Sequence, residues 1–217
     1  MRIVDLSHRL DETVQVYPGD PVFTTSPAAT LDADGFNVAH VAMGTHTGTH
    51  VDAPFHVVAD GARVDECDLA LFAGPAVVVD VRGRGPRERI TWADLQPSAE
   101  RMGPGRMVLL HTGWSVHFRS ERYLQHPYLD AEAAERVLAT GVPTLGVDTL
   151  NPDETVLDGG AGLPVHEAVL GAGGVIAENL TNLAALDGVR EPLVSMLPLA
   201  LAHADGAPVR AVALLDL

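Results

Sequence analysis

The sequence contains no lysine, so all 14 of its basic residues are arginine. This absence excludes a Schiff-base lysine, a phosphate-loop lysine and a lysine general base. Cys67 is the only cysteine, which excludes a disulfide within the chain. Because acidic residues flank Cys67 on both sides, we expect a raised thiol pKa and an inert cysteine, and not a nucleophile.

The sequence also has no apolar run that approaches the length of a transmembrane helix. Asp5 lies where a signal peptide would have its apolar core, so we expect a cytoplasmic protein. The net charge of -15 argues against nucleic acid and against an anionic membrane surface as partners. With 217 residues, of which 47% are hydrophobic, the chain is long enough for one well-buried core. We expect residues 1–217 to form a single domain.

Apolar runs and turn residues predict a mixed α/β fold, with a mainly β core and a few flanking helices. The predicted strands cover residues 3–6, 76–81, 107–111, 145–148, 175–178, 193–201 and 209–215, with a turn at 204–208. The predicted helices begin after Thr91, cover residues 130–140, and run from Pro164 to Gly171.

The segment from 46 to 56 carries three histidines and one aspartate, His46, His50, Asp52 and His56, at alternating positions. Its glycines, its proline and its β-branched residues argue against a helix, so we expect an extended segment with all four groups on one side. In a straight strand the Cα atoms of His46 and His50 would lie roughly 13 Å apart. We therefore predict a bend at Gly48, which lets both imidazoles reach one metal ion.

Other candidate site residues lie in loops and at strand ends. Glu178 ends an apolar strand, and a carboxylate buried there needs a partner or a metal. Tyr17, in a turn-rich loop, and Trp114, which follows a strand, are candidates for a substrate pocket. Taken by itself, His166 fits an exposed helix histidine better than a ligand.

The segment from 46 to 56 resembles the HxGTHxDxPxH signature of the cyclase family of metal-dependent hydrolases, which includes bacterial kynurenine formamidases and isatin hydrolases. The resemblance extends to weaker motifs along most of the chain, at residues 17–20, 60–61, 112–114, 146–149, 166–167 and 178–182. It implies a swivelling β/β/α cyclase-like fold, assembled as a homodimer or homotetramer. Val57 departs from the pattern, because formamidase-like members often have an aromatic residue there.

By this resemblance, His46, His50 and Asp52 hold one divalent ion, zinc or manganese. Asp52 holds a second ion together with His166 and Glu178, although some relatives use a single ion. His56 is then the general acid/base. The implied reaction is hydrolysis, by metal-activated water, of a small aryl formamide or cyclic amide. Two alternatives remain open: a metal-assisted lyase or dehydratase, and a metal- or ligand-binding protein without catalysis.

Overall fold

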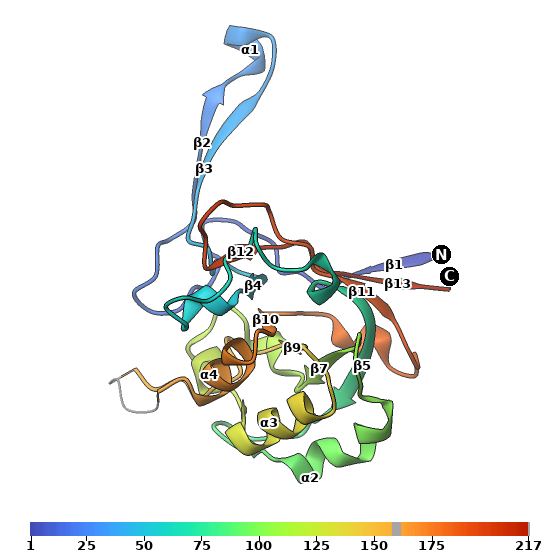
Figure 1. Cartoon of the computed structure of the whole chain (residues 1–217). Coiled ribbons are helices and arrows are strands. Elements are labelled where there is room, and N and C mark those ends of the chain that lie inside the picture. Colours follow the sequence, from blue (N-terminus) through green and yellow to red (C-terminus); the bar gives the residue numbers. More distant parts are fainter. Residues whose placement is uncertain (158–161, 217) are drawn as a thin grey trace.

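The structure is a computed structural model that describes residues 1–157 and 162–216. Its main feature is a nine-stranded sheet with the order β1-β13-β11-β5-β7-β9-β10-β4-β12 (Figure 1). The strands are β1 (Arg2–Asp5), β4 (His50–Asp52), β5 (Ala73–Asp80), β7 (Met107–His111), β9 (Thr144–Val147), β10 (Val175–Glu178), β11 (Leu193–Ser195), β12 (Gly206–Pro208) and β13 (Val212–Leu215). The predicted mixed α/β class with a mainly β core is confirmed.

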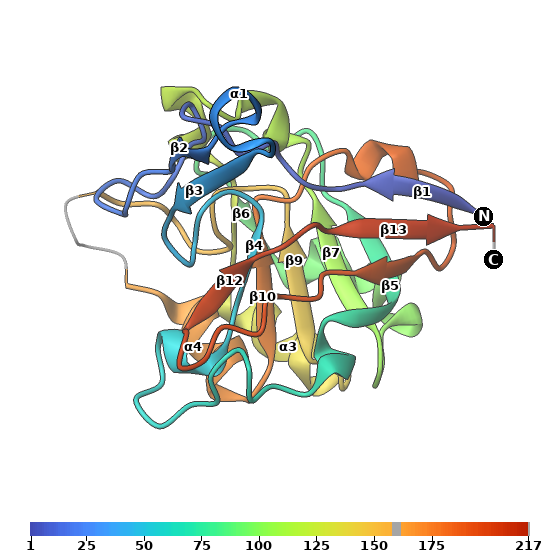
Figure 2. The same cartoon turned by 90° about the horizontal axis from the view of Figure 1, so that it is seen from above.

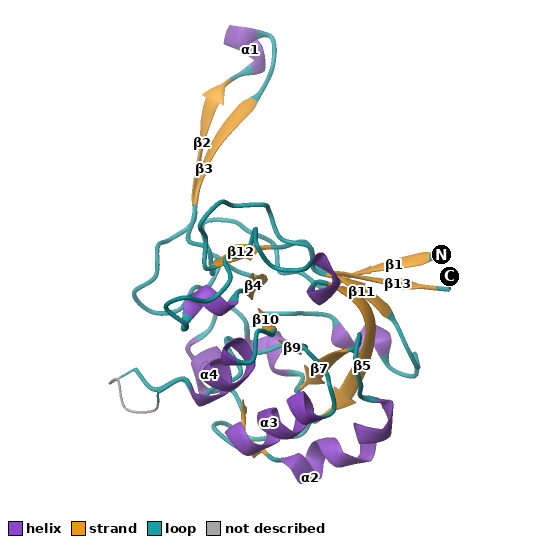
Figure 3. Cartoon of the chain, viewed as in Figure 1, coloured by secondary structure: helices purple, strands orange, loops and turns teal. Residues whose placement is uncertain are grey.

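The centre of the sheet is parallel, from β5 through β7 and β9 to β10, and both of its flanks are antiparallel. Helices α2 (Trp92–Leu95), α3 (Ala131–Ala139) and α4 (Pro164–Gly171) gather on one side of it (Figure 3). The parallel strands are apolar on both faces, as strands buried from two sides must be. Along β7, for example, Val108 and Leu110 join the apolar cluster that contains the helices, whereas Met107 and Leu109 join the cluster on the other face.

The two ends of the chain lie side by side, because β1 pairs with β13 at one edge of the sheet (Figure 2). Two predictions near the C-terminus are wrong. The strand predicted over 193–201 ends at Ser195, and Leu197, Leu199 and Leu201 are exposed. Residues 206–208, predicted as part of a turn, form β12, because they find backbone partners in β4 far away in the sequence.

The extended segment predicted over 46–56 is also largely wrong, because only His50–Asp52 forms a strand. His46 lies in a turn, and Pro54–His56 forms a short 3-10 helix that begins at the proline. The predicted bend is confirmed, since Gly48 has a φ of 64°. The left-handed backbone at this residue, and not a uniform strand, therefore sets the direction of His46 relative to His50.

A hairpin of β2 (Thr24–Ala29) and β3 (Val38–Ala42), with the short helix α1 (Leu31–Asp34) at its tip, projects from the body (Figure 1). No helix or strand was predicted for this segment. Its pattern carries little signal, because both faces of the hairpin are exposed and neither is selected for apolar residues. A third, smaller sheet pairs β6 (Arg89–Ile90) with β8 (Tyr128–Leu129). Within the described residues, none of the helices combines the length and hydropathy that a membrane crossing requires.

Replacement of Gly48 by alanine should destabilise the protein. A Cβ there would lie 2.5 Å from Cδ2 of Leu10, in addition to the strain of a positive φ. Gly173→Ala is the matched control, because its φ is 80° and a Cβ would meet no atom within 4 Å. Chemical unfolding should show a loss of about 1–3 kcal/mol for Gly48→Ala and about 1 kcal/mol for the control. Equal losses would show that contact with Leu10 is unimportant.

Candidate metal centre and active site

The register between β4 and β10 brings His50 and Glu178 together. These residues are directly opposite each other, so their side chains lie on the same face of the sheet. Nε2 of His50 lies 3.3 Å from Oε2 of Glu178 and 3.2 Å from Oδ1 of Asp52, which follows two residues later on β4. One strand pair therefore supplies an imidazole and two carboxylates to one point.

Helix α4 adds His166 to this group. Its Nε2 lies 3.1 Å from Oε1 of Glu178 and 3.6 Å from Oδ2 of Asp52. Asp153 holds the start of the helix, because its carboxylate accepts hydrogen bonds from the backbone N–H groups of Val165 and His166. The same carboxylate accepts a hydrogen bond from Nδ1 of His166, at 2.6 Å. His166 is 3% exposed, so it is not the exposed helix histidine that its local sequence suggests.

The outer nitrogens of two imidazoles are free to bind an ion. His50 donates Nδ1–H to the carbonyl of Gly48, at 2.7 Å, and His166 donates Nδ1–H to Asp153. In the neutral ring, Nε2 then carries the lone pair on the side of the carboxylates, which is how second-shell partners orient histidine ligands. The bend at Gly48 thus also fixes the ring of His50.

His46 approaches the same carboxylate oxygen of Asp52 that faces His50. Its Nδ1 is 2.7 Å from Oδ1 of Asp52, and its Nε2 is 2.9 Å from Oδ2 of Asp205. Burial of the ring acts to lower its pKa, but the hydrogen bonds to Asp205 and Asp52 outweigh burial and raise the pKa of His46 to about 9. The ring is therefore held between two carboxylates.

The cluster has the burial and charge that suit a divalent cation. Asp52 is 0% exposed, and burial acts to raise its pKa, but His50 and His166 hold that pKa well below its usual range. Burial acts to lower the pKa of His50, but the negative charges of the adjacent Asp52 and Glu178 outweigh burial and raise this pKa to about 10. Positive charge is thus strongly favoured at this point, whether protons or a metal ion supply it.

Unpaired polar atoms support the fit to a metal. Nε2 of His50, Oδ2 of Asp52 and Oε1 of Glu178 are buried and have no hydrogen-bond partner among the described residues. Leaving such groups unpaired is costly, and imidazole with carboxylate is a common ligand set for zinc and manganese. Ligand atoms of His46, His50 and Asp52 lie within 4.8 Å of one another, and so do those of Asp52, His166 and Glu178. Asp52 is common to both groups.

His56 lies beside this cluster on the 3-10 helix that follows β4. Its ring centroid is 4.1 Å from that of His46 and 5.7 Å from that of His166. Nδ1 of His56 lies 3.3 Å from Oδ2 of Asp205, which also contacts His46. The hydrogen bond from His46 is the largest cause that holds the pKa of Asp205 below its usual range, and the hydrogen bond from His56 is the next.

A cavity of about 390 Å³ opens over the cluster, with His46, His56, His166 and Glu178 in its wall. Tyr17, Val156 and Leu163 give the wall an apolar part. The volume falls in the range of sites for small organic ligands. The cavity therefore places an apolar surface beside the candidate metal ligands.

Of the two residues predicted for a substrate pocket, one lies in the cavity wall and the other in an apolar cluster. Tyr17 lines the cavity. Trp114 is not among the described residues that line it: its side chain is 4% exposed in an apolar cluster with Tyr123 and Leu150, against which Tyr17 packs. Val57 packs against the apolar cluster that contains the helices. The residue after His56 is thus a poor guide to the substrate.

Asn179 links the motifs around the site. It directly follows Glu178 and has a φ of 54°, a conformation that asparagine tolerates better than most residues. Its side-chain oxygen accepts a hydrogen bond from the Tyr123 hydroxyl, at 3.0 Å, and its backbone carbonyl accepts one from Oγ1 of Thr49, at 2.6 Å. The ends of β10 and β4 are thereby tied together next to Glu178 and His50.

Asp153 and Asp205 belong to the site but were missed by the sequence analysis. Asp205 contacts His46 and His56 from a distant part of the chain, and Asp153 contacts His166 across thirteen residues of sequence. Each lies in a turn-like context, beside a proline or a glycine, where an aspartate needs no further explanation. Their roles depend on contacts that local patterns do not contain.

Cys67 is half-buried and is not among the described residues of the cavity wall. Burial raises the pKa of its thiol, and the charges of Glu66 and Asp65 raise it further. The predicted direction of the shift is confirmed, with burial as the larger cause. A thiol of raised pKa suits a structural cysteine.

Fold and site together define a mixed α/β protein with a candidate metal centre at the base of an open cavity. The family model described as "Putative cyclase" matches residues 4–154, and the chain belongs to this family. A kynurenine formamidase of Bacillus cytotoxicus is 36% identical over 211 residues, which cover 96% of this chain and 95% of that protein.

Solved structures agree with this assignment. Isatin hydrolase A from Ralstonia solanacearum superposes with a TM-score of 0.90 at 28% identity, and the match covers 99% of this chain and 92% of that one. A structure described as a novel cyclase gives a TM-score of 0.82 at 19% identity, over 98% of this chain and 88% of that one, a likeness of fold alone. The predicted cyclase-family fold is confirmed.

Proposed function

We propose that the protein is a metal-dependent hydrolase that cleaves a carbon–nitrogen bond in a small aryl formamide or cyclic amide. The observation that carries this proposal is the buried group of His50, Asp52, His166 and Glu178 beside the cavity, in which atoms of His50, Asp52 and Glu178 have no hydrogen-bond partner among the described residues. A kynurenine formamidase and an isatin hydrolase among the relatives supply the class of substrate.

We further propose that His46, His50 and Asp52 hold one divalent ion and that Asp52, His166 and Glu178 hold a second. Zinc and manganese both suit this ligand set, and one or two ions fit the two overlapping groups of ligands. When bound, a divalent ion lowers the pKa of water toward neutrality and polarises a carbonyl group.

The chain's own contribution is the handling of protons by His56. Asp205 accepts a hydrogen bond from Nδ1–H of His56, which leaves Nε2 as the nitrogen for proton transfer. In this proposal, Nε2 accepts a proton from water and returns it to the departing nitrogen, which needs a proton to leave as an amine. Tyr17 and Leu163 offer apolar contact to an aryl group in the cavity.

We propose that the whole chain forms one domain. This proposal is supported by the strands from both ends of the sequence, which join the same sheet. We also propose a homodimer or homotetramer. A lone cysteine fits a reducing compartment, and we propose the cytoplasm.

Replacement of Glu178 by glutamine should strip metal from the protein. The amide keeps the shape of the side chain but removes the charge that faces His50 and His166. Glu167→Gln is the matched control, because Glu167 is exposed on α4 next to His166. Elemental analysis after dialysis should show metal in the wild type and in the control but a loss in Glu178→Gln. Full metal content in Glu178→Gln would rule out this residue as a ligand.

Replacement of His56 by alanine should lower turnover by about 10²–10⁴-fold, because it removes the proposed proton carrier. Metal content should stay near that of the wild type. His117→Ala is the control, since His117 is a half-buried histidine that does not line the cavity. Steady-state kinetics with parallel metal analysis tests this. A His56→Ala enzyme with wild-type turnover would contradict the assignment.

The reaction class can be tested with an aryl formamide and with isatin, after chelation and restoration of zinc or manganese. Metal-dependent turnover of either compound in ¹⁸O-labelled water should place solvent oxygen in the new carboxylate. A product without the label would point to a lyase, and stoichiometric metal without turnover of either compound would point to a binding protein.

A further inference from the structure

Beside the two proposed ligand groups, the structure contains a third group of metal-ligating side chains. Ligand atoms of His46, His56 and Asp205 lie within 4.8 Å of one another. Nε2 of His46 is 2.9 Å from Oδ2 of Asp205, and Nδ1 of His56 is 3.3 Å from the same oxygen. Two imidazole nitrogens and a carboxylate oxygen are ligands that zinc accepts. These three residues are here called the outer set, and His46, His50 and Asp52 the inner set.

The two sets differ in their access to solvent. In the inner set, the side chains of His50 and Asp52 are 2% and 1% exposed. In the outer set, those of His46, His56 and Asp205 are 17%, 26% and 34% exposed. His46 and His56 also line the cavity. A hydrated ion in the cavity therefore has access to the outer set, whereas the inner set lies behind it.

His46 belongs to both sets, through opposite nitrogens of its ring. Its Nδ1 lies 2.7 Å from Oδ1 of Asp52, in the inner set, and its Nε2 faces Asp205, in the outer set. A neutral imidazole has one nitrogen with a free lone pair, because the other nitrogen carries a proton. His46 can therefore bind an ion in only one set at a time.

Both neutral forms of the His46 ring have a hydrogen-bond partner. With an ion at Nε2, the proton lies on Nδ1 and is donated to Asp52; with an ion at Nδ1, the proton lies on Nε2 and is donated to Asp205. The change from the first form to the second releases one proton from Nδ1 to solvent and takes up one at Nε2. The surroundings of His46 therefore suit the transfer of an ion from the outer set to the inner set.

We propose that His46, His56 and Asp205 form an entry site, at which Zn²⁺ is captured from the cavity before it reaches the buried inner set. His50, Asp52 and Nδ1 of His46 then receive the ion, and His56 and Asp205 are released. Nδ1 of the released His56 regains its proton and donates it to Asp205, which is the form proposed above for proton transfer. The entry site presupposes the proposed metal centre, but no particular substrate or reaction.

General electrostatic attraction is the alternative explanation of ion capture. The chain has a net charge of -15, and Asp20 also lines the cavity. Such attraction depends on charge alone and is screened by salt. Replacement of neutral His56 by alanine separates the two explanations, because it removes a ligand of the outer set and leaves the charge of the cavity unchanged.

The rate of zinc uptake tests the entry site. Protein freed of metal with a chelator is mixed with increasing concentrations of Zn²⁺ in a stopped-flow instrument, and a zinc-sensitive dye reports the free ion. The wild-type uptake rate should level off as zinc rises, because the outer set fills first. In His56→Ala and in Asp205→Asn, the zinc concentration that gives half the maximal rate should rise at least about 10-fold, as expected when a metal site loses a partner.

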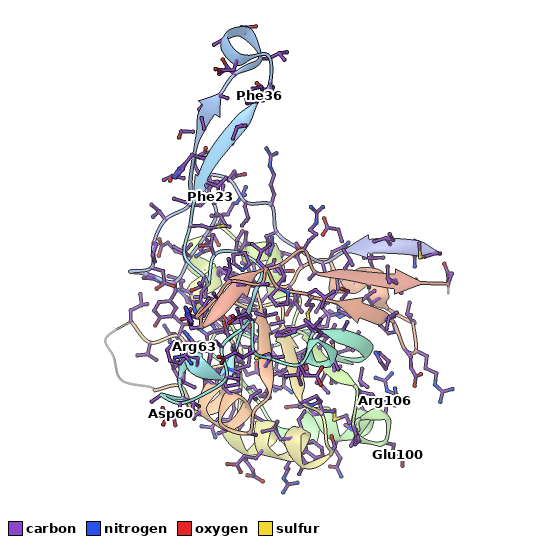
Figure 4. All side chains as sticks on the ribbon, turned by 45° about the horizontal axis from the view of Figure 1, so that its top comes forward. Phe23, Phe36, Asp60, Arg63, Glu100 and Arg106 are labelled. Carbon is purple, nitrogen blue, oxygen red and sulfur yellow. The ribbon has the colours of Figure 1, made fainter. Side chains whose placement is uncertain are left out.

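Control variants change the same residue types outside the outer set. Asp20→Asn removes a charge from the cavity wall. Asp60→Asn removes one from the exposed loop after His56, which Figure 4 shows at the edge of the molecule. His117→Ala removes a half-buried histidine that is not among the described residues of the cavity wall. All three should take up zinc as the wild type does. If Asp20→Asn slows uptake as much as Asp205→Asn, general attraction explains the capture and the entry site is refuted.

The rate of zinc release separates an entry site from a residue that only orients His46. An entry site is also the exit path, so Asp205→Asn should slow release to a chelator by the same factor as uptake and leave the affinity unchanged. A residue that only holds the ring of His46 would, when replaced, speed release and leave uptake as in the wild type. Faster release with unchanged uptake would therefore overturn the entry site.

Metal content and circular dichroism complete the test. Both variants should keep the wild-type fold and the wild-type metal content after long equilibration, and each tests the site without the other. A wild type that holds zinc, with both variants loading at its rate, would overturn the entry site alone. A wild type that takes up no zinc would overturn the entry site and the proposed metal centre together.

Discussion

The burial of Asp52 and Glu178 is the constraint on which the site depends. Burying a single carboxylate costs several kcal/mol. Here two buried carboxylates share the same two imidazole partners. Two imidazoles, those of His50 and His166, face them and offset this cost. The arrangement concentrates negative charge at a largely buried point at the wall of the cavity. A divalent cation satisfies such a point better than protons do, because it pairs with several oxygens at once.

The sheet supplies this arrangement through register. Glu178 is at the end of a parallel strand, and its neighbour β4 is an antiparallel strand of three residues that delivers His50 and Asp52 to the same face. A shift of one residue in this pairing would turn His50 and Asp52 to the opposite face. The hydrogen bonds of Asn179 to Tyr123 and Thr49 hold the pairing in place. Within the shared motifs, Thr49 and Asn179 therefore act as scaffold for the ligands, and not as ligands.

The histidines around the cluster differ in role because their second nitrogens have different partners. His50 and His166 each donate one N–H to an oxygen outside the cluster, which frees the other nitrogen. His46 lies between Asp52 and Asp205, and His56 has contact with Asp205 alone of these two. Asp205 thus connects the candidate ligands to the candidate acid/base. Asp205 directly precedes β12, and the pairing of β12 with β4 brings this late part of the chain to the site.

By itself the sequence determined the mixed α/β class, most central strands, the bend at Gly48 and the cluster from His46 to His56, because these depend on residue type and spacing over a few positions. The sequence left Glu178 with either a partner or a metal, and only the family resemblance made it and His166 candidate ligands of one ion, since a strand end and a helix start are ambiguous contexts. Tertiary structure alone decided the places of Asp153 and Asp205, the burial of Trp114 away from the cavity, the pairing of β12 with β4 and the projecting hairpin of residues 24–42. The physical reason is that most of these features depend on contacts between residues far apart in the sequence, and the hairpin on a lack of such contacts within the described chain. Neither long-range contacts nor their absence leaves a periodic pattern in the sequence.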